Sequence, residues 1–269
     1  MKRKALSSAV LFAVIHFAAM PSFADGVTVG NPSTVAKLVP AKQLEDQAGV
    51  QYEELKKQAA QKGVLGEANS PQVVRLNQIA QRIIPFSTRF NPRAKEWKWE
   101  ISLIKSKQIN AFCMPGGKIA FYTGLLEGLQ LSDDEAAIVM GHEIAHALRE
   151  HARERLAKTQ LTQLGASVLG SIIGKGQYSD LFQMGGKLWT LKFSRDDESE
   201  ADVVGLDLAA RAGYDPRAGV SLWQKMSAAN KGAPPQWLST HPAGENRIKE
   251  IEKHLPEVMP LYEKARRVT

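Results

Sequence analysis

The chain has 269 residues, of which 43% are hydrophobic and 23% are charged, and its formal net charge is +7. This composition is typical of a globular protein with one large domain or two small ones, and it gives no indication of disorder or of a repeat array. Three of the positive charges are Lys2, Arg3 and Lys4, which leaves +4 for the chain from Asp25, too little and too scattered to indicate nucleic-acid binding. The single cysteine, Cys113, excludes an internal disulfide.

The first 24 residues have the pattern of a cleavable export signal. A basic start is followed by an apolar run from Ala5 to Met20 and by a small-x-small cleavage site that ends at Ala24. A transmembrane anchor is the alternative, but it needs about 20 apolar residues. No cysteine follows the apolar run, so no lipid attachment is expected. We therefore predict a signal peptide over residues 1–24 and a soluble, exported mature protein.

Two helices are predicted before the first strand. Residues 25–40 are rich in Gly, Pro, Ser and Thr and indicate a flexible tether, which leaves residues 41–269 for a single domain. Apolar residues then recur at steps of three and four, which predicts a helix that ends near Gly63. These residues are Leu44, Ala48, Tyr52, Leu55 and Ala59. A second helix is expected to begin at Ser70-Pro71 and to stop before Pro85.

A small antiparallel sheet is predicted beside this helical body. Residues 97–103 alternate between apolar and polar, which is typical of a half-buried strand. Residues 109–114 and 118–122, joined by Pro-Gly-Gly, indicate a hairpin. Such a sheet can simply cover the core, or its edge can pair with an extended peptide.

The central helix carries the motif HEIAH. It is expected to begin at Ser132 with Glu135 in a capping box, and its body is apolar nearly all round, which predicts burial. His142 and His146 lie one turn apart on one face and can bind one Zn²⁺, which would offset the cost of burying two histidines. Glu143, directly after the first histidine, is then placed to act as a general base toward water. The alternative is an ordinary helix that happens to contain two histidines.

The residues after this helix leave more alternatives open. Arginines at its end suit the helix dipole, and His151 is expected half a turn away from His142 and is not predicted to be a ligand. Residues 161–174 are apolar and small but too short to span a bilayer. They predict a core helix, a mobile cover over a cleft, or a segment that contacts a membrane.

A catalytic zinc site usually has three protein ligands, so a third is needed. The pattern HExxHxxGxxH is excluded, because Arg149 and Ala152 occupy its last two defined positions. The acidic helix expected over residues 194–213 offers a glutamate instead. Glu198 lies on its small, apolar face, whereas Glu200 lies on a more mixed face, so Glu198 is the better candidate. On the same face as Glu198, Asp202 can accept a hydrogen bond from a ligand imidazole, and a glycine at position 205 would allow close helix packing.

Three motifs in this order, HEIAH, SRDDESEAD and HPAGENRI, together with INAFCMPGGKIAFYTGLL, resemble the zinc metallopeptidases of the HtpX and CaaX-prenyl-protease type, peptidase family M48. The resemblance covers about residues 73–255 and implies an α+β, mainly helical, zincin-like domain with the small sheet beside the HExxH helix. It implies one Zn²⁺ bound by His142, His146 and Glu198, with Glu143 as catalytic base. It also implies that the strand around residues 110–112, which are Asn110, Ala111 and Phe112, borders the substrate cleft.

The C-terminal motif adds two residues whose role stays open. His241 and Arg247 belong either to an ordinary capped helix with a solvent histidine or, by the resemblance, to the site. There they would stabilise an oxyanion, or His241 would occupy the open metal position. The chain lacks spanning helices and tetratricopeptide-like repeats, so it is similar to compact periplasmic members, and prenyl-protein substrates are not expected.

The expected function is that of a periplasmic zinc metalloendopeptidase acting on polypeptides, namely unfolded or misassembled envelope proteins, including outer-membrane proteins. One alternative is a chaperone-like quality-control factor with latent, self-inhibited protease activity. Another is a zinc hydrolase that acts on a non-peptide cell-wall bond. Nucleic acid is not expected as a partner, peripheral membrane contact is an open alternative, and the oligomeric state is not predicted.

Overall fold

The computed structural model describes residues 25–164, 187–229, 235–241 and 247–267. The predicted signal peptide lies outside these residues, as does most of the segment 161–174. None of the helices in the described ranges combines the length and the apolar character needed to cross a membrane.

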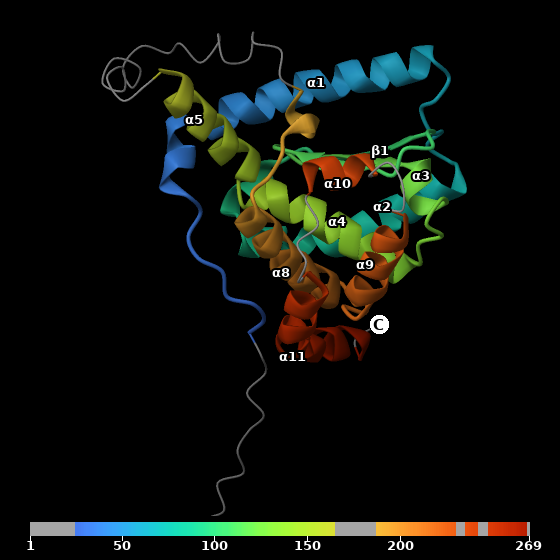
Figure 1. Ribbon diagram of the computed structural model, residues 1–269. Coiled ribbons are helices and arrows are strands. Elements are labelled where there is room, and N and C mark those ends of the chain that lie inside the picture. Colours follow the sequence, from blue (N-terminus) through green and yellow to red (C-terminus); the bar gives the residue numbers. More distant parts are fainter. Residues whose placement is uncertain (1–24, 165–186, 230–234, 242–246, 268–269) are drawn as a thin grey trace, which may run out of the picture.

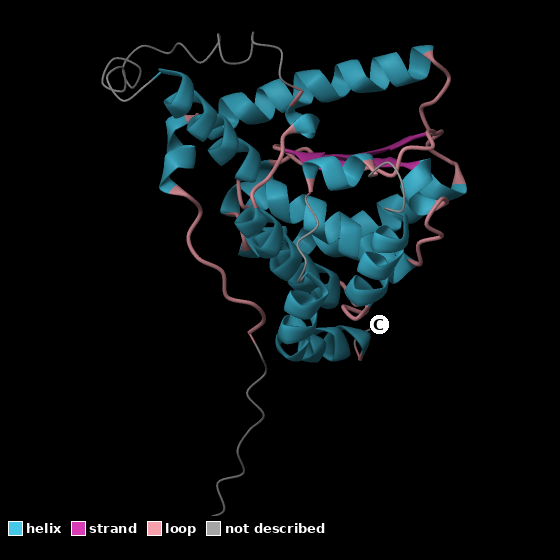
Figure 2. Ribbon diagram, in the orientation of Figure 1, coloured by secondary structure: helices cyan, strands magenta, loops and turns pink. Residues whose placement is uncertain are grey.

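The fold is mainly helical, with one small sheet enclosed between helices (Figures 1 and 2). The long helix α1 (Ala41–Gln61) covers one face of the sheet, and α4 (Asp133–Leu148) lies on the other side. Helix α8 (Arg195–Arg211) packs against α4, and α11 (Arg247–Arg266) packs against α8 at the far side from α1. The α+β, mainly helical class predicted from the sequence is confirmed.

The remaining elements complete this arrangement around α4. They are η1 (Thr34–Leu38), α2 (Pro71–Ile83), η2 (Ile84–Arg89), η3 (Pro92–Glu96), α3 (Thr123–Leu126), α5 (His151–Leu164), η5 (Leu188–Thr190), α9 (Ala218–Ala229) and α10 (Gln236–Thr240). The predicted helices α1 and α2 are present, and so is the predicted capping box of α4, in which Ser132 Oγ accepts from the Glu135 amide at 3.2 Å. These boundaries are set by local sequence, which is why periodicity and capping predict them.

The sheet contains β1 (Glu100–Ile104), β2 (Ala111–Met114) and β3 (Lys118–Tyr122) in the order β1-β3-β2. The predicted hairpin is confirmed, because β2 pairs antiparallel with β3. The prediction of a fully antiparallel sheet is wrong, because β1 pairs parallel with β3. The reason is that β1 lies beside β3 and not beside β2, the strand that follows it in the chain. The alternation of apolar and polar residues predicts a strand but does not say which strand it pairs with.

The two edges of this sheet have different surroundings. The outer edge of β1 is covered by residues 64–66, since the Gly66 amide donates to Leu103 O at 2.8 Å and the Lys105 amide donates to Val64 O at 2.7 Å. Strand β2 forms the other edge and packs beside α4. The edge that borders the HExxH helix is therefore β2.

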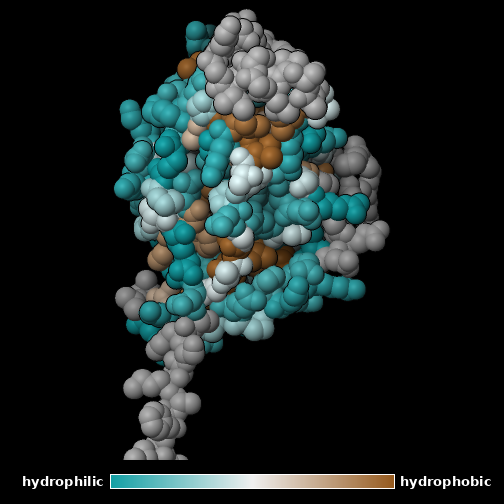
Figure 3. Space-filling model, turned by 90° about the vertical axis from the view of Figure 1, so that its left-hand side faces the viewer, coloured by the Kyte–Doolittle hydropathy of each residue, from teal (hydrophilic) through white to brown (hydrophobic). Residues whose placement is uncertain are grey.

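The segment 25–40 packs along the body, which differs from the flexible tether expected from its composition. It forms η1, and Val27 and Val39 are buried. The Val27 amide donates to the buried carboxylate of Asp207 at 3.0 Å. Composition predicts a lack of regular structure but says nothing of such contacts with distant residues. Figure 3, which views the side of the molecule where this segment runs, shows a mainly hydrophilic surface with smaller hydrophobic areas.

Helices α4 and α8 pack at unusually close range through two glycines. A Cβ added to Gly205 would lie 2.7 Å from the backbone nitrogen of His142, and one added to Gly141 would lie 2.6 Å from Gly205 O. The prediction that glycine at position 205 allows close helix packing is thus confirmed. The contact brings the acidic first turns of α8 alongside the histidines of α4.

Candidate metal centre

The two histidines of α4 lie side by side in the protein interior. His142 is 3% exposed and His146 is 1% exposed, and their Nε2 atoms lie 3.1 Å apart. Both side chains leave the same face of α4, as the four-residue spacing predicts. Two ring nitrogens at this distance point at one position in space.

Helix α8 brings Glu198 to the same position. Glu198 is 2% exposed, and its carboxylate oxygens lie 3.5 Å from His142 Nε2 and 3.4 Å from His146 Nε2. Glu200 points elsewhere, toward Arg149 and His151. Glu198, and not Glu200, therefore faces the two histidines, as the periodicity of α8 indicates.

His241, at the end of α10, is the fourth residue of the cluster. It is 2% exposed, so the alternative of a solvent histidine is wrong. Its Nδ1 lies 3.3 Å from His142 Nε2 and 3.0 Å from Glu198 Oε1. One ligand atom from each of His142, His146, Glu198 and His241 lies within 4.8 Å of the others. The structure therefore places His241 with the three predicted ligands, which agrees with the alternative in which it occupies the open metal position.

The spacing of these donors fits a zinc ion. Four ligands about 2.1 Å from a tetrahedral ion lie about 3.4 Å from one another. Five of the six separations between the donor residues are between 3.0 and 3.5 Å, and the sixth, between His146 and His241, is within 4.8 Å. Three imidazoles and one carboxylate are also a donor set that suits Zn²⁺. The residues present therefore fit the group that the sequence predicts.

Hydrogen bonds within the cluster shift the pKa values of its members. Burial would lower the pKa of His142, but hydrogen bonds to Asp202 and Glu198 outweigh it and raise the pKa to about 9. Burial would raise the pKa of Glu198, but the charge of His241 and hydrogen bonds from His142 and His241 hold it well below its usual range. Burial lowers the pKa of His146 well below its usual value. A proton on His142 thus competes with a metal ion for the same lone pair.

Asp202 and Arg247 support the ligands from behind. His142 Nδ1 donates to Asp202 Oδ1 at 3.0 Å, as predicted for a residue that orients a ligand imidazole. Arg247 donates from Nη1 to Glu198 Oε2 at 2.6 Å and from Nε to Asp202 Oδ2 at 2.7 Å. Arg247 therefore binds both carboxylates, and its predicted role toward an oxyanion stays a prediction.

Glu143 lies beside the cluster with a partner that the sequence analysis missed. The indole nitrogen of Trp237 donates to Glu143 Oε1 at 2.6 Å, and His241 Nε2 lies 3.6 Å from the same oxygen. The Trp237 ring stacks on the His241 ring with centroids 5.0 Å apart. The only sequence signal was the position of this tryptophan four residues before His241, which places the two on one face of a short helix.

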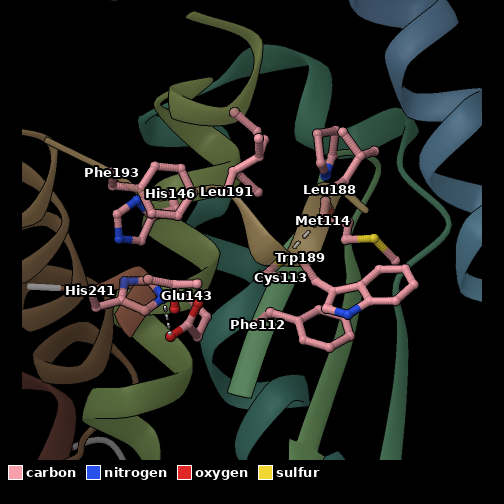
Figure 4. Close-up of a pocket in the computed structure, with 14 residues that line it drawn as sticks. Phe112, Cys113, Met114, Glu143, His146, Leu188, Trp189, Leu191, Phe193 and His241 are labelled. Atoms are coloured by element: carbon pink, nitrogen blue, oxygen red, sulfur yellow. Dashed lines mark hydrogen bonds and ion pairs between the residues drawn. The ribbon is translucent and has the colours of Figure 1, made fainter. Parts of the chain in front are cut away.

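A pocket opens on the cluster between α4, β2 and the segment around η5 (Figure 4). Phe112, Cys113 and Met114 from β2 line it on one side, and Glu143 and His241 lie on the other. Of the predicted substrate strand, Phe112 lines the pocket, whereas the other two residues do not. The buried Asn110 pairs with β3 through its carbonyl, which accepts from the Tyr122 amide at 3.1 Å, and Ala111 belongs to the core.

Two aromatic side chains from the segment after residue 186 also line this pocket. Trp189 stacks on Phe112 with ring centroids 5.8 Å apart, and Phe193 stacks on His146 with centroids 4.0 Å apart. The Phe193 amide also donates to Thr240 O at 3.2 Å. The sequence analysis did not single out this segment, because its composition gives no indication of contact with the motif.

Comparison with known proteins agrees with this geometry. The profile of Peptidase family M48 matches residues 72–255. The mitochondrial metalloendopeptidase OMA1 of Schizosaccharomyces pombe is 35% identical over 190 residues, which cover 70% of this chain and 54% of that protein. Metalloprotease LoiP of Escherichia coli is 28% identical over 230 residues, which cover 83% of this chain and 86% of that protein. The Beta-barrel assembly-enhancing protease of Yersinia pestis is 27% identical over 199 residues, which cover 69% of this chain and 39% of that protein. This chain spans about half or less of the length of the OMA1 proteins that it matches.

Proposed function

The chain belongs to peptidase family M48, and from this premise we propose that it is a zinc-dependent endopeptidase that hydrolyses peptide bonds of unfolded or misassembled envelope proteins. The observation that carries this proposal is the convergence of four buried donors, within 4.8 Å of one another, next to the carboxylate of Glu143 at the wall of a pocket. A metal centre that served only to stabilise the fold would not need a base and a pocket beside it.

In the proposed reaction, His142, His146 and Glu198 hold the ion. When bound, Zn²⁺ supplies Lewis-acid chemistry, which makes a water molecule more acidic and polarises the scissile carbonyl. Glu143 takes the proton from the attacking water and passes it to the leaving amine nitrogen. The hydrogen bond from Trp237 to Glu143 Oε1 fixes the direction in which this carboxylate points. Arg247 and Asp202 keep the ligands in place during the cycle.

The proposed substrates are extended polypeptides. Strand β2 is the sheet edge that borders the pocket, and an extended backbone can add to such an edge only if its own segment is unfolded. The signal-peptide pattern of residues 1–24 and the likeness to two bacterial proteases, one of them named for β-barrel assembly, support a periplasmic location and envelope or outer-membrane substrates.

The test is digestion of casein by the purified protein. Wild type should cleave casein, and a chelator should abolish cleavage until zinc is restored. The Glu143→Gln variant should bind zinc with wild-type affinity and lose cleavage, because it keeps the shape of the side chain but cannot accept the proton. Cleavage of a cell-wall glycan but not of casein would favour a non-peptide hydrolase. Unchanged casein turnover in Glu143→Gln would refute the assigned mechanism.

His241 favours a second candidate, a quality-control factor whose protease activity is latent. A site with four protein ligands is closed, whereas a catalytic zinc site keeps one position open. His241 lies 3.3 Å from His142 Nε2 and 3.0 Å from Glu198 Oε1, so in this position it would occupy the fourth ligand position and would have to move to open it. Replacement of His241 by Ala should raise casein cleavage if it blocks the site, and should lower cleavage if it acts in the reaction. Retained cellular function in Glu143→Gln would favour a binding role.

A further inference from the structure

The two histidines of α4 have different partners behind them. His142 Nδ1 donates directly to a carboxylate, that of Asp202, whereas His146 Nδ1 contacts a third histidine, His151, at 2.9 Å. His151 Nε2 in turn lies 2.8 Å from Glu200 Oε2. Building on the proposed metal site, we propose that His151 and Glu200 are positioning residues, which set the tautomer and the orientation of His146 for metal binding.

The hydrogen-bond chain permits only one arrangement of protons that leaves His146 able to bind a metal. His146 Nε2 faces the cluster, 3.1 Å from His142 Nε2, so this nitrogen must offer its lone pair. The proton of neutral His146 then sits on Nδ1 and is donated to His151 Nδ1. His151 consequently carries its own proton on Nε2 and donates it to Glu200. A carboxylate at the end of the chain thus orders both rings.

Glu200, the last residue of this hydrogen-bond chain, is held by an ion pair with Arg149. Arg149 Nη2 donates to Glu200 Oε1 at 2.8 Å and also to the backbone oxygen of Gly30 in the N-terminal segment. The two carboxylate oxygens of Glu200 are thus divided between Arg149 and His151, and the arginine pair holds Oε2 in place as the acceptor for the His151 ring.

Burial makes these contacts hard to replace with water. His146, His151 and Arg149 are 1%, 2% and 5% exposed. The Phe193 ring covers the face of His146, with an angle of 23° between the two planes. If His151 lost its acceptor nitrogen, the Nδ1 proton of His146 would have no partner in an enclosed site, which costs free energy. The ring would then rotate or change its tautomer, and either change removes a lone pair from the metal.

The backbone is shaped to bring His151 to this position. In a continuous helix, His151 would point about 140° away from His146, because each residue adds about 100°. Instead α4 ends at Leu148, Glu150 adopts a positive φ of 61°, and α5 begins at His151. A non-glycine residue rarely adopts this conformation, and here the turn reverses the direction of His151 so that it faces back to α4. Helical spacing predicted that His151 would lie apart from the site. The turn at Glu150 interrupts the helix, and this is why His151 lies beside His146 instead.

The experiment measures zinc affinity by competition with a chromophoric chelator, and the melting temperature of each protein after zinc removal. His151→Phe keeps the ring volume but removes both nitrogens, and it should weaken zinc binding about 10–100-fold. His151→Gln offers an oxygen to His146 and an amide to Glu200, and it should restore affinity to within a few fold of wild type. Glu200→Gln should weaken binding about tenfold. His254→Phe, at a surface histidine paired with Glu257, is the matched control and should leave affinity unchanged.

Each outcome bears on the proposal. Weaker zinc binding in His151→Phe, with rescue by His151→Gln and a metal-free melting temperature close to wild type, supports a positioning role. Wild-type affinity in both His151→Phe and Glu200→Gln would overturn it. If His151→Phe does not fold, the affinities of His151→Gln and Glu200→Gln decide, and equal weakening in both would also overturn the proposed chain. Failure of wild type itself to bind zinc would instead refute the proposed metal site.

Discussion

Replacement of Gly205 by Ala tests whether close packing of α4 on α8 holds the metal centre together. The added Cβ would lie 2.7 Å from His142 N and 2.9 Å from Gly141 C, whereas ordinary contacts begin at 3.4 Å. Both atoms belong to the backbone of α4 and cannot rotate away. Helix α8 must therefore move by roughly 0.7 Å, or the contact stays strained.

The destabilisation caused by Gly205→Ala is measured against a matched glycine-to-alanine variant in another helix, α1. Gly49 lies within α1, and a Cβ there meets nothing within 4 Å. Gly49→Ala should stabilise the protein by about 0.8–1.0 kcal/mol, because alanine has the higher helix propensity. Gly205→Ala gains the same propensity but adds an overpacking cost of about 1–3 kcal/mol. The difference between the two variants should be that cost, which corresponds to roughly 2–4 °C in melting temperature per kcal/mol.

The displacement of α8 in Gly205→Ala should also weaken zinc binding. Metal–ligand distances tolerate deviations of about 0.2 Å, so a displacement of α8 that carries Glu198 and Asp202 should weaken zinc binding by at least about tenfold. Urea unfolding of the metal-free proteins and zinc competition would measure both effects. If Gly205→Ala is as stable as Gly49→Ala and binds zinc like wild type, then the interhelical contact is not as close as described.

Three further predictions concern other parts of the molecule. Trp237→Phe should lower kcat about 10–100-fold with unchanged zinc content and little change in KM, because it removes the hydrogen bond that orients the Glu143 carboxylate, and such a bond is worth about 1.5–3 kcal/mol. Steady-state kinetics on a peptide would check this. In the zinc-free protein, the pKa of His142 is about 9 and that of a histidine in an unfolded chain is 6.5, so the resulting stabilisation is complete below pH 6.5 and is lost as pH rises through 9. The melting temperature in chelator should therefore fall between these pH values, and a flat profile would contradict the raised pKa. Gly26→Ala should destabilise the protein by about 1–3 kcal/mol in urea unfolding, because Gly26 has a φ of 85° and an added Cβ would lie 2.0 Å from Asp207 Oδ2.

Local sequence predicted the elements that present the candidate ligands. The four-residue spacing of His142 and His146 places both on one face of a helix whatever surrounds it, and the apolar face of α8 identified Glu198 over Glu200. The capping box at Ser132 and the hairpin of β2 and β3 are likewise encoded by a few adjacent residues. These features depend on backbone periodicity and short-range hydrogen bonds, which a sequence displays directly.

Contacts between distant segments could not be predicted in this way. The parallel pairing of β1 with β3 and the packing of residues 25–40 depend on which surfaces meet after folding. The stacking of Phe193 on His146 likewise joins segments that have no common period. Family resemblance named His241 and Arg247, but only the folded chain shows that one joins the ligand cluster and that the other binds the carboxylates.

The sequence by itself therefore determined the chemistry available to this protein: two helical histidines, a neighbouring base and an inward-facing glutamate. Tertiary structure decided how those groups are completed, with His241 as a fourth donor, Trp237 on the base and His151 behind His146. The physical reason is the range of the interactions. Periodicity governs residues within a few turns of one helix, whereas His151 reaches His146 only through the left-handed turn at Glu150, and His241 arrives from a segment 95 residues beyond His146.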